Sequence, residues 1–121
     1  MELQRLEYDF TVCQVNTLEH VDFTREFVFL SKTDDEISLV CESAYAPPNP
    51  IASEAGWKAL KISGILDFGM IGVIAKIATL LAEVDISLFV ISTYNTDYIL
   101  VKSENLEKSV HALECNGYVI K

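Results

Sequence analysis

A single carboxylate lies between two tyrosines at the predicted junction of two strands. The segment Ile86–Lys102 contains two apolar runs separated by the short polar turn Tyr94-Asn95-Thr96-Asp97. Asp97 would offer two acceptor oxygens to an ammonium or guanidinium group, and the Tyr94 ring could stack on a cation or an aliphatic stem. The pattern predicts a recognition site. Alternatively, Asp97 accepts backbone N–H bonds within its own turn, and Tyr94 and Tyr98 are half-buried strand aromatics.

A second feature able to bind charge is the predicted start of a helix. The loop Leu66-Asp-Phe-Gly-Met70 precedes a helix expected over Ile71–Val84. The N–H groups of a first helical turn are unpaired and lie at the positive end of the helix dipole, so they can bind a carboxylate, and Gly72 would permit close approach. A zwitterion would fit both features. Alternatively, Gly69 and Gly72 only punctuate the loop and Asp67 is a turn or helix-entry residue.

The composition excludes several classes of partner. Nine Lys and Arg against eighteen Asp and Glu give 9 − 18 = −9, a charge that disfavours nucleic acid and anionic membrane surfaces. The apolar runs are far shorter than the roughly 20 residues of a membrane span. The start Met-Glu-Leu-Gln-Arg also lacks the order of a secretory signal. We therefore expect a soluble cytoplasmic protein.

Catalysis and metal binding find little support in the residue types. His20 and His111 have no convincing nucleophile or metal partner in the sequence, so both are expected at the surface. Cys13, Cys41 and Cys115 are widely separated and match neither a disulfide framework nor a zinc site, so all three are expected in or near the core. We predict no enzyme, no cofactor and no bound metal.

A proline-rich connector divides the chain. All three prolines fall in Tyr45–Pro50, which excludes an ordinary helix or central strand there. Before it, alternating polar and apolar residues predict a strand over Leu6–Val12. The runs Phe27–Ser31 and Ile37–Cys41 predict a hairpin. The segment Asn16–Glu26 is ambiguous and would hold at most one short helical turn.

The residues after the connector follow a regular order of elements. We expect a strand over Trp57–Ile65, the first helix, a central strand over Ile86–Ile91 and its hairpin partner. Ser103 is the expected N-cap of a second helix that ends at Asn116-Gly117, and Tyr118–Lys121 is the last strand. This β-α-β-β-α-β order predicts an α+β, ferredoxin-like sandwich with helices on one face of an antiparallel sheet.

The first helix is predicted to be covered on more than one side. Over Ile71–Val84 the polar side chains Lys76, Thr79 and Glu83 form one narrow stripe, and the rest of the surface is apolar. Packing on its own sheet explains about half of that coverage. The remainder indicates a neighbouring subdomain or a second copy of the chain.

These residues resemble a known family. The loop and helix from Leu66, followed by Leu80-Leu-Ala-Glu-Val-Asp-Ile-Ser87, resemble the amino-acid-binding ACT domain. The segment Ile91-Ser-Thr-Tyr-Asn-Thr-Asp-Tyr98 is similar to the Ser-Thr-Tyr/Phe-x-x-Asp motif of CASTOR-type arginine sensors and of small bacterial proteins built from the same ACT pair. The resemblance implies two ferredoxin-like subdomains, residues 1–50 with eroded helices and residues 51–121 as a full ACT domain, and a homodimer.

In this family the ligand lies at an interface between ACT units. Transferred to this sequence, the resemblance implies contacts from the loop, from the motif and from a facing copy: Asp67, Met70, Gly72 and Val73; Thr93, Tyr94 and Asp97; and Ser87 and Leu88, respectively. Met70 stands where arginine-binding members can place an acidic residue, and a thioether is only a weak acceptor. A small or apolar amino acid, with its ammonium group on Asp97, is therefore as compatible as arginine.

The expected function is a regulatory sensor that binds a free amino acid or similar zwitterion and acts on an unidentified protein partner. A ligand touching two chains stabilises the arrangement in which both sets of contacts exist. The competing hypothesis is a ligand-independent dimerisation or protein-interaction module with a vestigial cleft. A third is an enzyme with an unrecognised site.

Overall fold

The computed structural model describes residues 1–67 and 69–121, so Phe68 of the predicted loop lies outside the described residues. The chain forms two compact units. Met1–Glu7 and Lys58–Lys121 make one, here called the helical unit, and Tyr8–Trp57 make the other, the strand unit. The long strand β5 (Ala52–Ile62) begins in the strand unit and ends in the helical unit.

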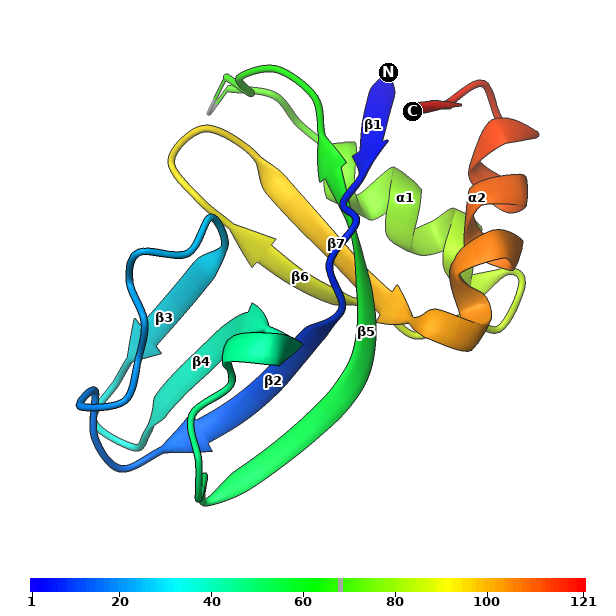
Figure 1. Ribbon diagram of the computed structural model, residues 1–121. Helices are drawn as coiled ribbons and strands as arrows, with labels where there is room; N and C mark the ends of the chain where they lie inside the picture. The colour runs from blue at the N-terminus through cyan, green and yellow to red at the C-terminus, as the bar shows by residue number, and fades with distance from the viewer. Residues whose placement is uncertain (68) are drawn as a thin grey trace. The chain divides into compact units, whose positions relative to one another are not determined.

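The helical unit has the predicted β-α-β-β-α-β order (Figure 1). After β5 come α1 (Val73–Ala82), β6 (Phe89–Ser92), β7 (Asp97–Lys102), the 3₁₀ turn Ser103–Asn105, α2 (Leu106–Glu114) and β8 (Val119–Ile120). An additional strand, β1 (Glu2–Arg5), was not predicted. It runs antiparallel to β5 and parallel to β8, so the strands of this sheet lie in the order β6-β7-β5-β1-β8.

One hydrophobic core joins both helices to a single face of this sheet. Alternate residues of β5 and β7 point into it, because side chains of a strand alternate between faces. The buried members from strands and helices are Leu3, Leu60, Ile62, Ile77, Leu81, Ile86, Ile99, Val101, Leu113 and Tyr118. The predicted layering, with both helices on one sheet face, is confirmed.

Two predictions about α1 need correction. The helix begins at Val73 rather than Ile71, because Gly72 is its N-cap in the left-handed conformation, with φ 78°. Its solvent stripe is wider than predicted, since Ala75 and Ala82 are exposed beside the three polar side chains. Only Ile77 and Leu81 of α1 are fully buried.

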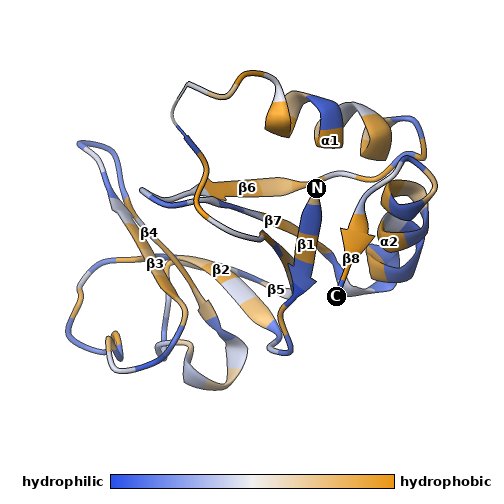
Figure 2. Ribbon diagram, turned by 90° about the horizontal axis from the view of Figure 1, so that it is seen from above, coloured by the Kyte–Doolittle hydropathy of each residue, from blue (hydrophilic) through white to orange (hydrophobic). Residues whose placement is uncertain are grey.

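The strand after α1 is shorter than predicted and lies at an edge of the sheet. It covers Phe89–Ser92 and, among the described strands, pairs only with β7. Ile86 is buried but belongs to the connection, where its N–H donates to Leu81 O at 3.0 Å after Asp85 takes a positive φ of 60°. Apolar residues on both faces therefore did not signify a central strand. Figure 2 shows β6 almost entirely in the hydrophobic colour.

Other boundaries also differ from the sequence prediction. The expected strand Leu6–Val12 begins four residues later than predicted: residues 6–9 form no strand, and β2 covers Phe10–Val15. The second helix begins later than predicted: residues 103–105 form a 3₁₀ turn, and Asn105 rather than Ser103 is the N-cap of α2. Its end is as predicted, with Gly117 at φ 90°.

The strand unit is a four-stranded antiparallel arrangement. β3 (Val28–Lys32) and β4 (Ile37–Glu42) form the predicted hairpin, closed by Thr33 N–H donating to Glu36 O at 2.9 Å, and the order is β3-β4-β2-β5. The ambiguous segment Asn16–Glu26 contains no helix. An ACT character for residues 1–50 therefore remains a prediction, as does the expected division at residue 50.

Candidate functional site

A cleft of about 360 Å³ lies between the start of α1 and the β6–β7 turn. Both segments are found at the same end of the helical unit (Figure 1). Seven of the nine predicted site residues line this cleft: Asp67, Met70, Gly72, Val73, Thr93, Tyr94 and Asp97. Ser87 and Leu88, which were assigned to a facing copy, lie outside it in the connection before β6.

Two threonines hold the β6–β7 turn. Thr93 N–H donates to Thr96 O at 2.9 Å, and Thr93 Oγ1 donates to the same oxygen at 3.0 Å. Thr96 is buried, and its Oγ1 donates to Ile62 O in β5 at 2.8 Å. The turn is thus fixed to the sheet from inside, without help from the Asp97 side chain.

Thr96→Val is expected to lower the free energy of unfolding by about 1–2 kcal/mol. The substitution keeps the shape of the side chain but leaves the Ile62 carbonyl without its hydroxyl donor. Urea unfolding followed by circular dichroism measures the change. Ser92→Ala, at an exposed neighbour, serves as the control and should change stability by less than about 0.5 kcal/mol.

Asp97 begins β7 and sits opposite Ser92 in the ladder. Its side chain is half-buried, and its carboxylate has no hydrogen-bond or ion-pair partner among the described residues. The alternative interpretation, in which Asp97 binds the N–H groups of its own turn, does not describe this geometry. The carboxylate remains available to a cation.

Asp67 organises the opposite wall of the cleft. Its Oδ1 accepts a hydrogen bond from Gly69 N–H at 2.8 Å, and its carbonyl accepts one from Met70 N–H at 3.0 Å. Leu66 N–H donates to Asn95 O at 2.7 Å, which joins this loop directly to the β6–β7 turn. Asp67 is therefore a turn residue, as one interpretation of the sequence held, and it also lines the cleft.

The start of α1 supplies backbone donors. The first intrahelical bond runs from Lys76 N–H to Gly72 O at 3.0 Å, and no side chain caps the helix among the described residues. The N–H groups of Val73, Ile74 and Ala75 are consequently left without intrahelical partners. All three residues line the cleft.

Sequence reasoning missed six lining residues: Leu66, Ile74, Ala75, Ser92, Asn95 and Thr96. Three of them, Ser92, Asn95 and Thr96, lie within the motif Ile91–Tyr98 that pointed to the site, so the motif already indicated their position. Ile74 and Ala75 were missed because the helix was expected to begin two residues earlier. Tyr94 is 81% exposed and is not a half-buried strand aromatic, whereas Tyr98 is buried in β7.

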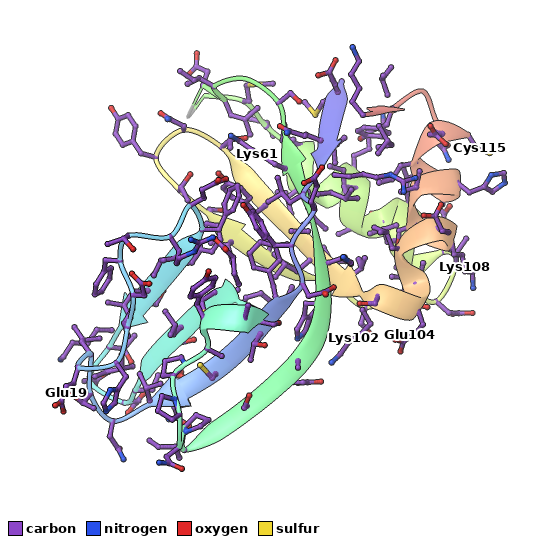
Figure 3. The ribbon with its side chains drawn as sticks, in the orientation of Figure 1. Glu19, Lys61, Lys102, Glu104, Lys108 and Cys115 are labelled. Carbon is purple, nitrogen blue, oxygen red and sulfur yellow. The ribbon has the colours of Figure 1, made fainter. Side chains whose placement is uncertain are left out.

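The remaining candidate groups lie away from this cleft. Among the described residues, no cluster of three or more His, Cys, Asp or Glu side chains could hold a metal ion. Cys13 and Cys41 are buried as predicted, but Cys115 is exposed at the end of α2 (Figure 3), which corrects that prediction. No helix of the described chain is long and apolar enough to span a bilayer.

Alkylation should separate these thiols. Burial raises the pKa of Cys41 to about 11 and also raises the pKa of Cys13, so both stay protonated and covered near pH 8. Iodoacetamide is expected to modify Cys115 alone in the folded protein and all three thiols in urea, as read by mass spectrometry. Modification of Cys41 at the rate of Cys115 without denaturant would contradict the burial.

Comparison with known proteins gives one family and several relatives. A family model described as ACT domain matches residues 52–115. The human protein named cytosolic arginine sensor for mTORC1 subunit 1 is 32% identical over 95 residues, which cover 73% of this chain. The match covers 29% of that protein, so this chain spans less than a third of the length of such relatives.

Two solved structures show the same fold. Protein Atu0741 from Agrobacterium tumefaciens is 28% identical and superimposes with a TM-score of 0.86, covering 99% of this chain and 91% of that one. Aspartate kinase from Clostridium acetobutylicum superimposes with a TM-score of 0.59 at 18% identity, over 87% of this chain and 32% of that chain. At that identity the kinase supports the fold alone.

Proposed function

Because the chain belongs to the ACT domain family, we propose that it is a non-catalytic regulatory protein that binds a free amino acid in the cleft between α1 and the β6–β7 turn. The observation that carries this proposal is a carboxylate with no partner among the described residues, Asp97, facing a cleft whose other wall is an uncapped helix start. Such a pair of opposite charges matches a zwitterion.

Each end of an amino acid has a physical counterpart. The α-carboxylate would accept hydrogen bonds from the N–H groups of Val73 and Ile74, where the helix dipole adds a partial positive charge. The α-ammonium would donate to Asp97. Met70 and Tyr94 would contact the side chain of the ligand. The human relative is named for arginine, but the same contacts would also accept a small or apolar amino acid.

The edge strand β6 supports a homodimer that completes the site. No charged residue occurs between Asp85 and Asp97, and β6 contains no proline or glycine. Natural edge strands usually carry such features to prevent pairing with another strand. An unprotected, apolar edge is therefore suited to pairing with a second copy.

The hydrogen-bond alternation indicates a register for this pairing. Since Thr93 N–H bonds to Thr96 O, alternation directs the N–H groups of Val90 and Ser92 away from β7. Antiparallel pairing about a twofold axis at Val90 would place Leu88 of the second copy opposite Ser92, and Ser87 opposite Thr93. The two residues expected from a facing copy would then reach the cleft.

The mechanism follows from linkage. A ligand that contacts both copies stabilises the dimer by an amount set by its concentration and affinity, and shifts association or the docking of a protein partner. Chemical change of the ligand plays no part. A cytoplasmic location remains a prediction.

Thermal shift with each of the twenty amino acids tests this proposal. One or a few are expected to stabilise the protein; at ten times its Kd a ligand adds about 1.4 kcal/mol, or roughly 4–8 °C. Asp97→Ala should abolish the shift, whereas Glu114→Gln, on an exposed face of α2, should preserve it. No response to any amino acid at millimolar concentration would refute amino-acid sensing.

One alternative function is favoured by a specific observation. The uncharged β6 edge would support dimerisation without any ligand, which makes the cleft vestigial and the protein an assembly module. Analytical ultracentrifugation distinguishes the two functions. An assembly module would have the same dimer dissociation constant with and without amino acids, whereas for a sensor the bound amino acid would change this constant.

A further inference from the structure

The cleft contains negative charge without a matching cation. Asp67 lies on the loop wall and Asp97 on the strand wall, and the described lining residues include no Lys, Arg or His. Two lysines of neighbouring elements, Lys61 and Lys76, are not lining residues and lie near aromatic rings. Lys61 Nζ lies 5.8 Å from the Tyr98 ring centroid, and Lys76 Nζ lies 5.7 Å from that of Tyr118.

The positively charged side chains on α2 and on the segment that leads into it are also remote from the cleft. Lys102 and Lys108 project from the α2 side of the helical unit, away from the β6–β7 turn (Figure 3). Arg5 is occupied by Glu107, with Nη1 to Oε1 at 2.8 Å. The positive charge facing Asp97 must therefore come from outside the described lining residues.

Two hydroxyl groups and one carboxylate oxygen of the cleft already have partners within the protein. The hydroxyls of Thr93 and Thr96 donate to backbone carbonyls, and Asp67 Oδ1 accepts from Gly69 N–H. Of the two charged side chains in the lining, Asp97 is the one whose half-buried carboxylate has no partner among the described residues. A charged acceptor in a partly desolvated site gains most from a charged donor.

We propose that the ammonium group dominates recognition in this cleft, so that it takes primary amines of zero or positive net charge and excludes dicarboxylic amino acids. The inference rests on the proposed function and specifies its ligand class. The helix start contributes only about half a unit charge, which water and salt screen, whereas the two carboxylates carry two full charges. Binding of the ligand's carboxylate is then secondary.

Matched derivatives test this order of recognition. Each amino acid that gives a thermal shift is compared by calorimetry with its amide, which keeps the ammonium, and its N-acetyl form, which keeps the carboxylate. L-leucine and L-arginine are the first to be tested. The amide should bind at least as tightly as the parent, and the N-acetyl form at least about tenfold more weakly. L-glutamate and L-aspartate should not bind.

Two variants locate the effect. Asp97→Asn removes the charge with little change of shape and should reduce the difference between amide and N-acetyl form to less than about threefold. Glu114→Gln removes an exposed charge from α2 and should leave that difference intact. High salt should lower the affinity for the amide more than the affinity for the N-acetyl form, because salt screens the attraction between the positively charged amide and the negatively charged cleft.

The outcomes separate the two proposals. Equal or tighter binding of an N-acetyl form, or binding of glutamate, overturns the ammonium preference and leaves amino-acid sensing in place. An unchanged preference in Asp97→Asn also overturns it. If no amino acid and no derivative binds, the proposed function itself fails.

Discussion

Val90→Pro is expected to convert a dimer of this chain into a folded monomer that no longer responds to the ligand. Proline removes the N–H group that alternation directs away from β7, so the ladder between β6 and β7 keeps its bonds. In the dimer proposed above, the twofold axis passes through Val90, and both copies lose their central donor. Two lost hydrogen bonds weaken association by roughly 30-fold, and the ring adds steric cost.

Two companion variants make the result specific. Val90→Thr retains the N–H group and a β-branched shape, so the dimer should persist. Ile91→Pro removes an N–H that alternation directs toward β7, so it should destabilise the hairpin itself. Sedimentation equilibrium gives the association constant and thermal shift gives the ligand response. A dimeric Val90→Pro protein with a normal response would place the interface elsewhere.

The sequence predicted the structure best where a local pattern of residues is compatible with a single kind of element. The order of elements after residue 57 and the pairing of the two apolar runs around Thr33 follow from period and turn residues, which act locally. Seven residues taken from the loop and the motif meet around one cleft because the fold places the start of α1 beside the β6–β7 turn. Their role in binding is still a prediction.

The sequence-based predictions were wrong where contacts between distant parts of the chain determine the structure. β1 lies between β5 and β8, two strands far along the chain, and the residues Glu2–Arg5 give no local pattern that predicts this pairing. The edge position of β6 was missed because apolar residues on both faces suit a central strand and an interface strand equally. The start of α1 was misplaced by two residues because the left-handed Gly72 terminates the loop rather than continuing the helix.

The turn beside Asp97 shows why the role of this carboxylate could not be determined from the sequence. A turn containing Thr, Asn and Asp offers several side chains that can close it. Thr93 and Thr96 perform this role, and Thr96 does so by reaching the carbonyl of Ile62, a contact between residues 34 positions apart. Because the two threonines hold the turn, the Asp97 carboxylate is not needed to close it.

Glu42→Ala is expected to be among the most damaging single substitutions in the strand unit. Glu42 is 2% exposed at the end of β4. Its Oε1 accepts from Arg25 Nη2 at 3.1 Å and Nε at 3.3 Å, and its Oε2 accepts from Phe27 N–H at 3.2 Å. The carboxylate thereby fixes the end of the helix-free segment that precedes β3.

Loss of this carboxylate leaves several groups unsatisfied at once. The Phe27 N–H loses its acceptor in a partly buried position, and a cavity replaces the side chain. We expect the free energy of unfolding to fall by about 2–4 kcal/mol, measured by urea unfolding. Glu42→Gln should be less severe, because the amide oxygen can still accept from one of these donors.

A surface carboxylate on the same segment provides the matched control. Glu26 accepts a hydrogen bond from Tyr8 Oη at 3.2 Å in an exposed position, so Glu26→Ala should cost less than about 0.5 kcal/mol. The contrast between the two alanine variants compares a buried carboxylate that accepts three hydrogen bonds with an exposed one that accepts a single bond. If Glu42→Ala and Glu26→Ala unfold at the same urea concentration, Glu42 does not anchor the segment, and the fold of residues 16–27 depends on its aromatic contacts instead.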